Sequence, residues 1–159
     1  PKKSPESCFA CHLDKRGQFS LPHSHPVMNG HVSCVDCHDM HSGDAIKGKG
    51  LALEGPNETC IKCHTAQKGP FVFEHGGVRQ GCISCHNPHG SINQKMLVAR
   101  DANLCLQCHL QTPGSAGTIN ANSITAPNDH VNRLRGGTCW SAGCHEAVHG
   151  SNVNYHLRY

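Results

Sequence analysis

Cysteines in this chain occur in pairs, and a histidine directly follows the second cysteine of every pair. Five pairs have the form C-x-x-C-H, and a sixth, Cys139-Trp-Ser-Ala-Gly-Cys144-His145, has four residues between its thiols. Together they use all 12 cysteines. Two thiols at this spacing can add across the two vinyl groups of one porphyrin, and the adjoining histidine then lies beneath the iron. The spacing therefore predicts covalent haem attachment.

Each motif contributes two thioether sites and one proximal imidazole, so six covalently attached haem c groups are the expected cofactors. The predicted attachment residues are Cys8, Cys11, Cys34, Cys37, Cys60, Cys63, Cys82, Cys85, Cys105, Cys108, Cys139 and Cys144. The predicted proximal ligands are His12, His38, His64, His86, His109 and His145.

Paired cysteines also occur at zinc sites, in redox-active dithiols and in disulfide frameworks. A single C-x-x-C-H is typical of either of the first two. Zinc would need two pairs per metal, and it gives no reason for a histidine after every second cysteine. A disulfide framework accounts for an even number of cysteines but not for the histidines. Six copies of the whole motif favour haem.

Nine of the 15 histidines remain for the opposite faces of the irons. Three of them follow a proximal histidine by three or four residues, and His75 precedes its motif closely. The predicted distal ligands are His25, His41, His75, His89, His130 and His149. His23 competes with His25, while His31 and His156 are expected to be spare. The alternative for His156 is to bind or contact a haem of a neighbouring subunit. The sequence leaves open which iron each distal histidine binds.

Methionine is the other usual axial donor. Met28, Met40 and Met96 lie beside better-placed histidines, so we interpret them as packing residues. Two imidazoles per iron leave no open coordination position, and no C-x-x-C-K variant occurs. Both features argue against an enzyme.

The elements that position these motifs must be short. Only 4% of the 159 residues are aromatic and 36% hydrophobic, with 17 glycines and 9 prolines. Such side chains bury too little surface to offset the conformational entropy of the chain. We therefore expect a multihaem cytochrome c fold with few short α-helices, mostly loops, little or no β-sheet and a core of stacked haems. Residues 57–64 and 101–109 are predicted helices that begin with capping residue types.

The motifs begin at intervals of 26, 26, 22, 23 and 34 residues, which indicates an internal repeat. Gly17-Gln-Phe19 before His25 resembles Gly69-Pro-Phe71 before His75, so the repeated unit spans two haems. We predict a single hexahaem domain over 1–159. It consists of a five-haem body (1–110), a polar surface loop (111–129) and a sixth-haem segment (130–159).

The formal charge of +3 omits the cofactors. Each oxidised haem with two neutral histidines adds about −1, so the loaded protein is near −3. Scattered lysines and arginines give no nucleic-acid signature, and no segment reaches the length of a membrane span. The chain begins at Pro1 without Met, as expected of a processed or trimmed product. Because such haems are attached outside the cytoplasmic membrane, we expect a periplasmic or extracellular location.

Several stretches carry a family resemblance. They are His25-Pro-Val27, Cys34-Val-Asp-Cys-His-Asp-Met-His41, Lys68-Gly-Pro-Phe-Val-Phe-Glu-His75, Cys82-Ile-Ser-Cys-His-Asn-Pro-His-Gly-Ser91 and Cys144-His-Glu-Ala-Val-His-Gly-Ser-Asn152. The chain resembles the periplasmic decahaem cytochromes of MtrA/DmsE type, and more distantly the pentahaem NrfB-type carriers. The resemblance runs from Cys8 to Asn152 and corresponds to the C-terminal part of a decahaem protein. The stretched sixth motif and the loop before it depart from the family pattern.

We therefore predict electron transfer through six closely spaced bis-histidine haems, with other redox proteins such as multihaem cytochromes, quinol-oxidising proteins or terminal reductases as partners. Two alternatives remain open. One is a subunit of an extracellular cytochrome filament, in which copies of the chain join their haems end to end. The other is a small multihaem reductase, which requires one iron with an open coordination position.

Overall fold

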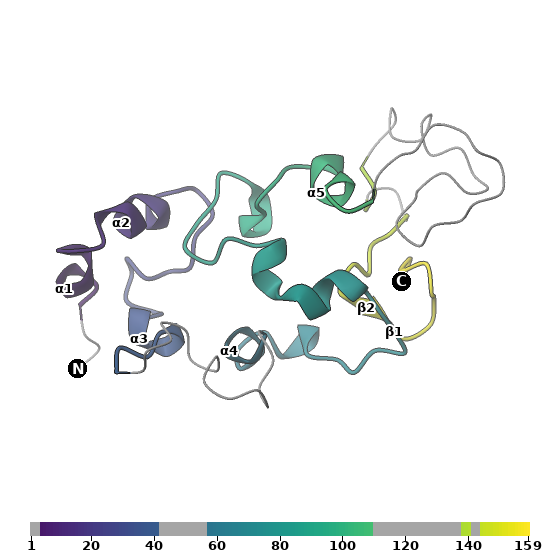
Figure 1. Cartoon of the computed structure of the whole chain (residues 1–159), viewed down its shortest axis with the longest axis horizontal. Coiled ribbons are helices and arrows are strands. Elements are labelled where there is room, and N and C mark those ends of the chain that lie inside the picture. The colour runs from purple at the N-terminus through teal and green to yellow at the C-terminus, as the bar shows by residue number, and fades with distance from the viewer. Residues whose placement is uncertain (1–3, 42–56, 110–137, 141–143) are drawn as a thin grey trace. The chain divides into compact units, whose positions relative to one another are not determined.

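The computed structural model describes residues 4–41, 57–109, 138–140 and 144–159, and most of them lie in turns and loops (Figure 1). The elements in chain order are α1 (Glu6–Phe9), α2 (Leu13–Phe19), α3 (Cys34–Cys37), α4 (Glu58–Ile61), the 3-10 helix η1 (Thr65–Gln67), β1 (Phe73–Glu74), the 3-10 helices η2 (Gly76–Gln80), η3 (Cys82–Ser84) and η4 (Gln94–Met96), α5 (Ala102–Leu106) and β2 (Gly150–Ser151). These short helices and the single small sheet confirm the expected fold class.

Five of the helices contain the first cysteine of a motif: α1, α3, α4, η3 and α5. The predicted helices over 57–64 and 101–109 are present in shortened form as α4 and α5. Their expected capping is wrong, because neither Asn57 nor Asp101 makes a side-chain cap bond at its own helix. The side chain of Asn57 binds another motif instead.

The chain divides into two compact units. The first comprises Pro1–Pro70 and His75–Val98, and the second comprises Phe71–Glu74 and Ala99–Tyr159. Four C-x-x-C-H motifs belong to the first unit, whereas the fifth and the stretched sixth belong to the second. The predicted five-haem body and sixth-haem segment stay a prediction, and the predicted loop over 111–129 lies outside the described residues.

In the second unit, β1 and β2 form an antiparallel pair that joins Phe73 to Ser151 and Glu74 to Gly150. In the first unit, an isolated bridge joins His23 to Ser91 in the same antiparallel sense. Both bridges bring the segment that follows a Gly-x-Phe sequence against a His-Gly-Ser sequence. The repeat seen in the sequence is therefore also a repeat of backbone pairing.

Very few hydrophobic side chains are buried. In the described part of the chain only Phe9 and Val27 qualify, each with 2% of its surface exposed. Phe9 packs near Phe19, with ring centres 6.1 Å apart, while Leu13 and Ile83 are among several large apolar side chains that face outward. The polypeptide by itself thus forms almost no core, in agreement with its composition.

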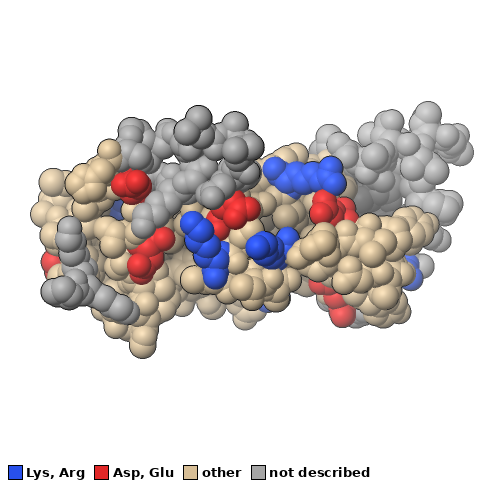
Figure 2. All heavy atoms as spheres, turned by 90° about the horizontal axis from the view of Figure 1, so that it is seen from below, with Lys and Arg blue, Asp and Glu red and all other residues tan. Residues whose placement is uncertain are grey.

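Charged side chains of both signs are interspersed on the face drawn in Figure 2. No helix within the described ranges is long and apolar enough to cross a membrane.

Candidate haem sites

One backbone hydrogen bond is common to all six motifs. The N–H of the proximal histidine donates to the carbonyl of the first cysteine at 2.8 to 3.0 Å. In the five regular motifs this bond closes a single helical turn. The turn places two thiols and an imidazole side by side, which is the donor set that haem c requires.

The stretched motif has the same closure despite its two additional residues. His145 N–H donates to the Cys139 carbonyl at 3.0 Å, as His64 N–H does to Cys60 in a regular motif at 3.0 Å. The proximal histidine of the stretched motif therefore bonds its first cysteine as in the regular motifs.

Zinc sites and disulfides are the alternatives to haem for these thiols. None of the 12 cysteines is disulfide-bonded. Within the described ranges, no three His, Cys, Asp or Glu side chains gather as a metal cluster, whereas a structural zinc needs four ligands. The cysteines instead lie in separate pairs, each with its own histidine, and this arrangement fits haem.

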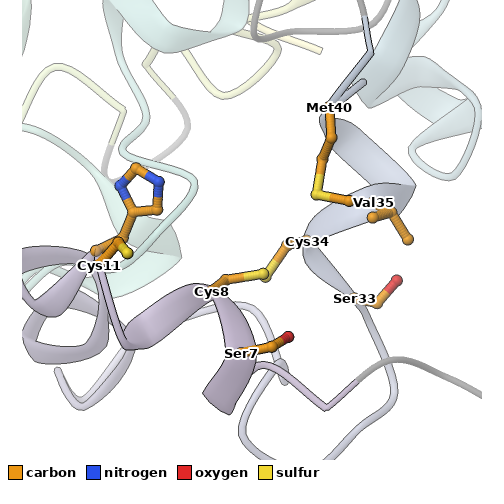
Figure 3. Close-up of a pocket in the computed structure, with 8 residues that line it drawn as sticks. Ser7, Cys8, Cys11, Ser33, Cys34, Val35 and Met40 are labelled. Carbon is orange, nitrogen blue, oxygen red and sulfur yellow. The ribbon is translucent and has the colours of Figure 1, made fainter.

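A cavity of about 550 Å³ opens between α1 and α3 (Figure 3). Its walls come from the first two motifs, and its lining residues are Ser7, Cys8, Cys11, His12, Ser33, Cys34, Val35 and Met40. This volume is within the usual range of cofactor sites. The attachment residues of the first motif thus face a space suited to a bulky group, and Met40 is one of its walls, consistent with a packing role.

The first cysteines of neighbouring motifs touch. Cys8 is hydrogen-bonded to Cys34, and Cys60 to Cys82; Figure 3 shows the first contact. Burial, with a smaller effect of Cys8, raises the pKa of Cys34. Burial and then Cys82 raise the pKa of the Cys60 thiol to about 11. We call residues 8–41 and residues 60–89 the two doubled motifs of the first unit. In each of them, two haem attachment points are therefore in direct contact.

Asn57 connects the third motif to the fourth. Its backbone carbonyl accepts the Cys60 N–H at 2.9 Å. Its side-chain carbonyl accepts the N–H of Cys82 at 2.7 Å and the Cys82 thiol at 3.0 Å, and its amide donates to the Val78 carbonyl at 2.7 Å. Sequence reasoning missed this role, because an asparagine before a helix is normally interpreted as a local cap.

Two proximal histidines are oriented through Nδ1. His86 Nδ1 donates to the Lys95 carbonyl at 2.8 Å, and His145 Nδ1 donates to the His156 carbonyl at 2.5 Å. A nitrogen bonded to a carbonyl must carry the proton, so Nε2 keeps its lone pair for a metal. His156 thus orients His145 through its backbone carbonyl. The type of its side chain could not have predicted this role.

Two predicted distal histidines are held in the same way. His25 Nδ1 donates to the Pro88 carbonyl at 2.7 Å, and His89 Nδ1 lies 3.2 Å from the side-chain oxygen of Gln18. Burial, followed by Lys15 and His38, lowers the pKa of His89 and favours the neutral imidazole that binds metals. His23, the alternative to His25 as a ligand, is held through its backbone. Its N–H donates to the Ser91 carbonyl at 3.2 Å, and its carbonyl accepts the Ser91 N–H at 2.8 Å.

Two pairs of imidazole rings have the separation of axial ligands. The ring centres of His38 and His89 are 6.0 Å apart, and those of His25 and His64 are also 6.0 Å apart. Two imidazole nitrogens bound at about 2 Å on opposite sides of one metal put their ring centres about 6 Å apart. Each pair joins a proximal histidine of one doubled motif to a predicted distal histidine of the other.

The remaining predicted ligands differ in their surroundings. His12 and His41 are exposed, whereas His75, His109 and His149 are partly buried. His130 lies outside the described residues. Of the predicted spare residues, His31 is exposed and the His156 ring packs on Tyr155 with centres 3.7 Å apart.

Comparison with known proteins identifies the family of the chain. The family model described as "Doubled CXXCH motif" matches residues 25–69 and 75–113. The chain is 36% identical over 148 residues to "Multiheme cytochrome MtrA" of Shewanella baltica (strain OS185). That alignment covers 92% of this chain but 43% of the relative, so the chain spans less than half of that protein's length. The chain belongs to the doubled C-x-x-C-H family, and it is a multihaem c-type cytochrome with covalently bound haem c.

Proposed function

We propose that this chain transfers electrons along six haem c groups, each iron held between two histidines. The observation that carries the proposal is that the four motifs of the first unit contact one another in pairs. Contacts link Cys8 to Cys34 and Cys60 to Cys82, and axial-distance ring pairs link His38 to His89 and His25 to His64.

Haem supplies the one-electron chemistry. The chain supplies placement: touching first cysteines bring the edges of neighbouring macrocycles together, and the exchanged histidines fix their order. Histidines on both faces leave an iron no site for substrate, which favours a carrier over a reductase. His41, His75, His130 and His149 are the proposed distal ligands of the other four irons.

The sixth haem is proposed on Cys139 and Cys144. The 3.0 Å bond from His145 N–H to the Cys139 carbonyl supports it, since the regular motifs have the same closure. Because haem attachment to such motifs occurs outside the cytoplasmic membrane, we place the protein in the periplasm or outside the cell. Its partners are other redox proteins, and a filament of its own copies is the second assembly consistent with an end-to-end haem chain.

The haem count is tested by intact-mass spectrometry of the holoprotein. We expect six haems, and five after Cys139→Ala together with Cys144→Ala. A wild-type mass with five haems and two unmodified cysteines in the last motif would contradict the proposed sixth site.

Electron transfer is tested by potentiometric titration. Six coupled centres should give one broad envelope, because each reduction changes the potential of its neighbours, as in coupled protonation. The spectrum should lack the near-infrared sulfur-to-iron band of methionine ligation. Turnover of a substrate at one open iron of the assembled protein would favour the reductase.

A further inference from the structure

Two buried serines occupy the same place after two of the motifs. Ser91 follows the fourth motif and Ser151 follows the stretched sixth motif, each directly after a His-Gly pair. They have 8% and 2% of their surface exposed and are the buried polar residues of the described ranges. The backbone of Ser91 pairs with His23, and that of Ser151 pairs with Phe73. A hydroxyl buried at such a site needs hydrogen-bond partners, and both serines find them in the backbone that follows.

In the first unit, Ser91 closes a short loop. Its hydroxyl donates to the Leu97 carbonyl at 2.6 Å and accepts the Asn93 N–H at 3.0 Å. Within this loop, the Lys95 carbonyl accepts the proton of His86 Nδ1 at 2.8 Å. Lys95 has a φ of 56°, in the left-handed region that side chains disfavour. The loop therefore needs contacts that hold this conformation, and the serine hydroxyl provides two of them.

In the second unit, Ser151 closes a loop of the same kind. Its hydroxyl donates to the Tyr159 carbonyl. Between these two residues lies His156, whose carbonyl accepts the proton of His145 Nδ1 at 2.5 Å. Leu157, the next residue, again has a left-handed φ of 58°. Two motifs with different thiol spacing thus share one arrangement of serine, loop and proximal histidine.

A carbonyl bonded to Nδ1 changes the electronic properties of an axial histidine. It keeps the proton on Nδ1 and makes Nε2 a stronger donor to the metal. A stronger donor stabilises ferric iron more than ferrous iron, so the reduction potential falls. Any side chain that keeps the carbonyl in place therefore takes part in setting that potential.

We propose that Ser91 and Ser151 are positioning residues that lower the reduction potentials of the haems on the fourth and sixth motifs. Each serine does so by holding a backbone carbonyl on the proximal histidine. This inference rests on the proposed function, in which the sixth motif carries a haem and every iron has two histidines. The two sites belong to different units, so each haem is adjusted by its own loop.

The test compares the holoproteins of Ser91→Ala and Ser151→Ala with the wild type by potentiometric titration. The integrated curve gives the equilibrium constant for adding all electrons, so the individual steps need not be resolved. We expect each variant to raise this constant about tenfold, which is an upward shift of about 59 mV for a one-electron centre.

The sign of the shift separates a positioning role from a structural one. A haem that only gained contact with water would shift downward, because water stabilises the more highly charged ferric state. A downward shift would therefore overturn the proposal. So would a variant that is less stable to urea but has an unchanged equilibrium constant.

Two further variants serve as a control and as a milder change. Ser20→Ala removes a hydroxyl-to-carbonyl bond of 3.1 Å, to Arg16 at the end of α2, and should leave the constant unchanged. An equal rise in this variant would overturn the proposal. Asn93→Ala removes an amide that donates to the same Leu97 carbonyl at 2.9 Å. It should give a smaller upward shift, and it decides the question if Ser91→Ala loses its haem.

Intact-mass spectrometry distinguishes a failure here from a failure of the proposed function. Five haems in the wild type, with Cys139 and Cys144 unmodified, would overturn the sixth haem and with it the role of Ser151. The role of Ser91 would still be decided by its own shift. Six haems without an upward shift in Ser91→Ala or Asn93→Ala would show that the positioning role alone is wrong.

Discussion

The two doubled motifs of the first unit position their second C-x-x-C-H turn by different means. In residues 8–41, α3 has a local capping box, in which Ser33 and Asp36 bond each other's backbone N–H. In residues 60–89, Gly81 occupies the capping position of η3 and has no side chain to offer. There Asn57, from the preceding motif, accepts the Cys82 N–H at 2.7 Å.

The consequence is a difference in how the paired haem sites are coupled. A capping box stabilises its own helical turn and does not position the neighbouring motif. A cap provided from a distance positions two motifs at once. Both regions have a contact between first cysteines. Only residues 60–89 are in addition bound together by a protein side chain, that of Asn57.

Removal of the haems from both doubled motifs should have the largest effect. Chain produced without haem attachment should show almost no helical signal in far-ultraviolet circular dichroism, because Phe9 and Val27 are the only buried hydrophobic residues in the described ranges. A haem-free chain that kept the helical signal of the holoprotein would contradict this expectation.

Asn57→Ala should have the next largest effect. It leaves the Cys82 N–H and the Val78 carbonyl without their partner in a partly buried site, at about 3 kcal/mol in the free energy of unfolding. Urea titration followed by Soret circular dichroism measures this loss. Asn57→Asp is the matched control: it keeps the acceptor for Cys82 but loses the donor to Val78, so we expect about half the effect. Equal stability of the wild type and Asn57→Ala would show that the distant cap is unimportant.

Gly81→Ala tests the same cap from its other side. Gly81 has φ 112 and ψ 146, a conformation that a residue with a Cβ adopts only under strain. We expect a loss of about 1 to 2 kcal/mol on the same titration. An alanine that is tolerated without loss would indicate that the turn before Cys82 can relax.

Ser33→Ala should have the smallest effect, about 1 kcal/mol, since it removes one local cap from α3. The variant should leave the shape of the redox envelope unchanged, whereas Asn57→Ala should change it. A Ser33→Ala effect as large as that of Asn57→Ala would mean that both doubled motifs depend equally on capping.

Much of the chemistry was predictable because it is local. Two thiols and a histidine within one helical turn define a haem attachment site wherever the turn lies, so the cysteine pairs specify the cofactor. Composition likewise predicted a chain with almost no core, as the exposure of Leu13 and Ile83 illustrates. Helices were predicted at the third and fifth motifs and are present as α4 and α5, whereas the helices α1, α3 and η3 at the other motifs were not predicted.

Only the tertiary structure decided which distant residues meet. His38 lies opposite His89 and His25 opposite His64, although long stretches of sequence separate them, and neither spacing nor residue type specifies such a partner. Asn57 shows the same limit, because its sequence position predicts a local cap while its side chain binds Cys82. The physical reason is that attachment of a haem depends on neighbours along the chain, whereas its second ligand comes from whichever segment the folded chain brings to the opposite face.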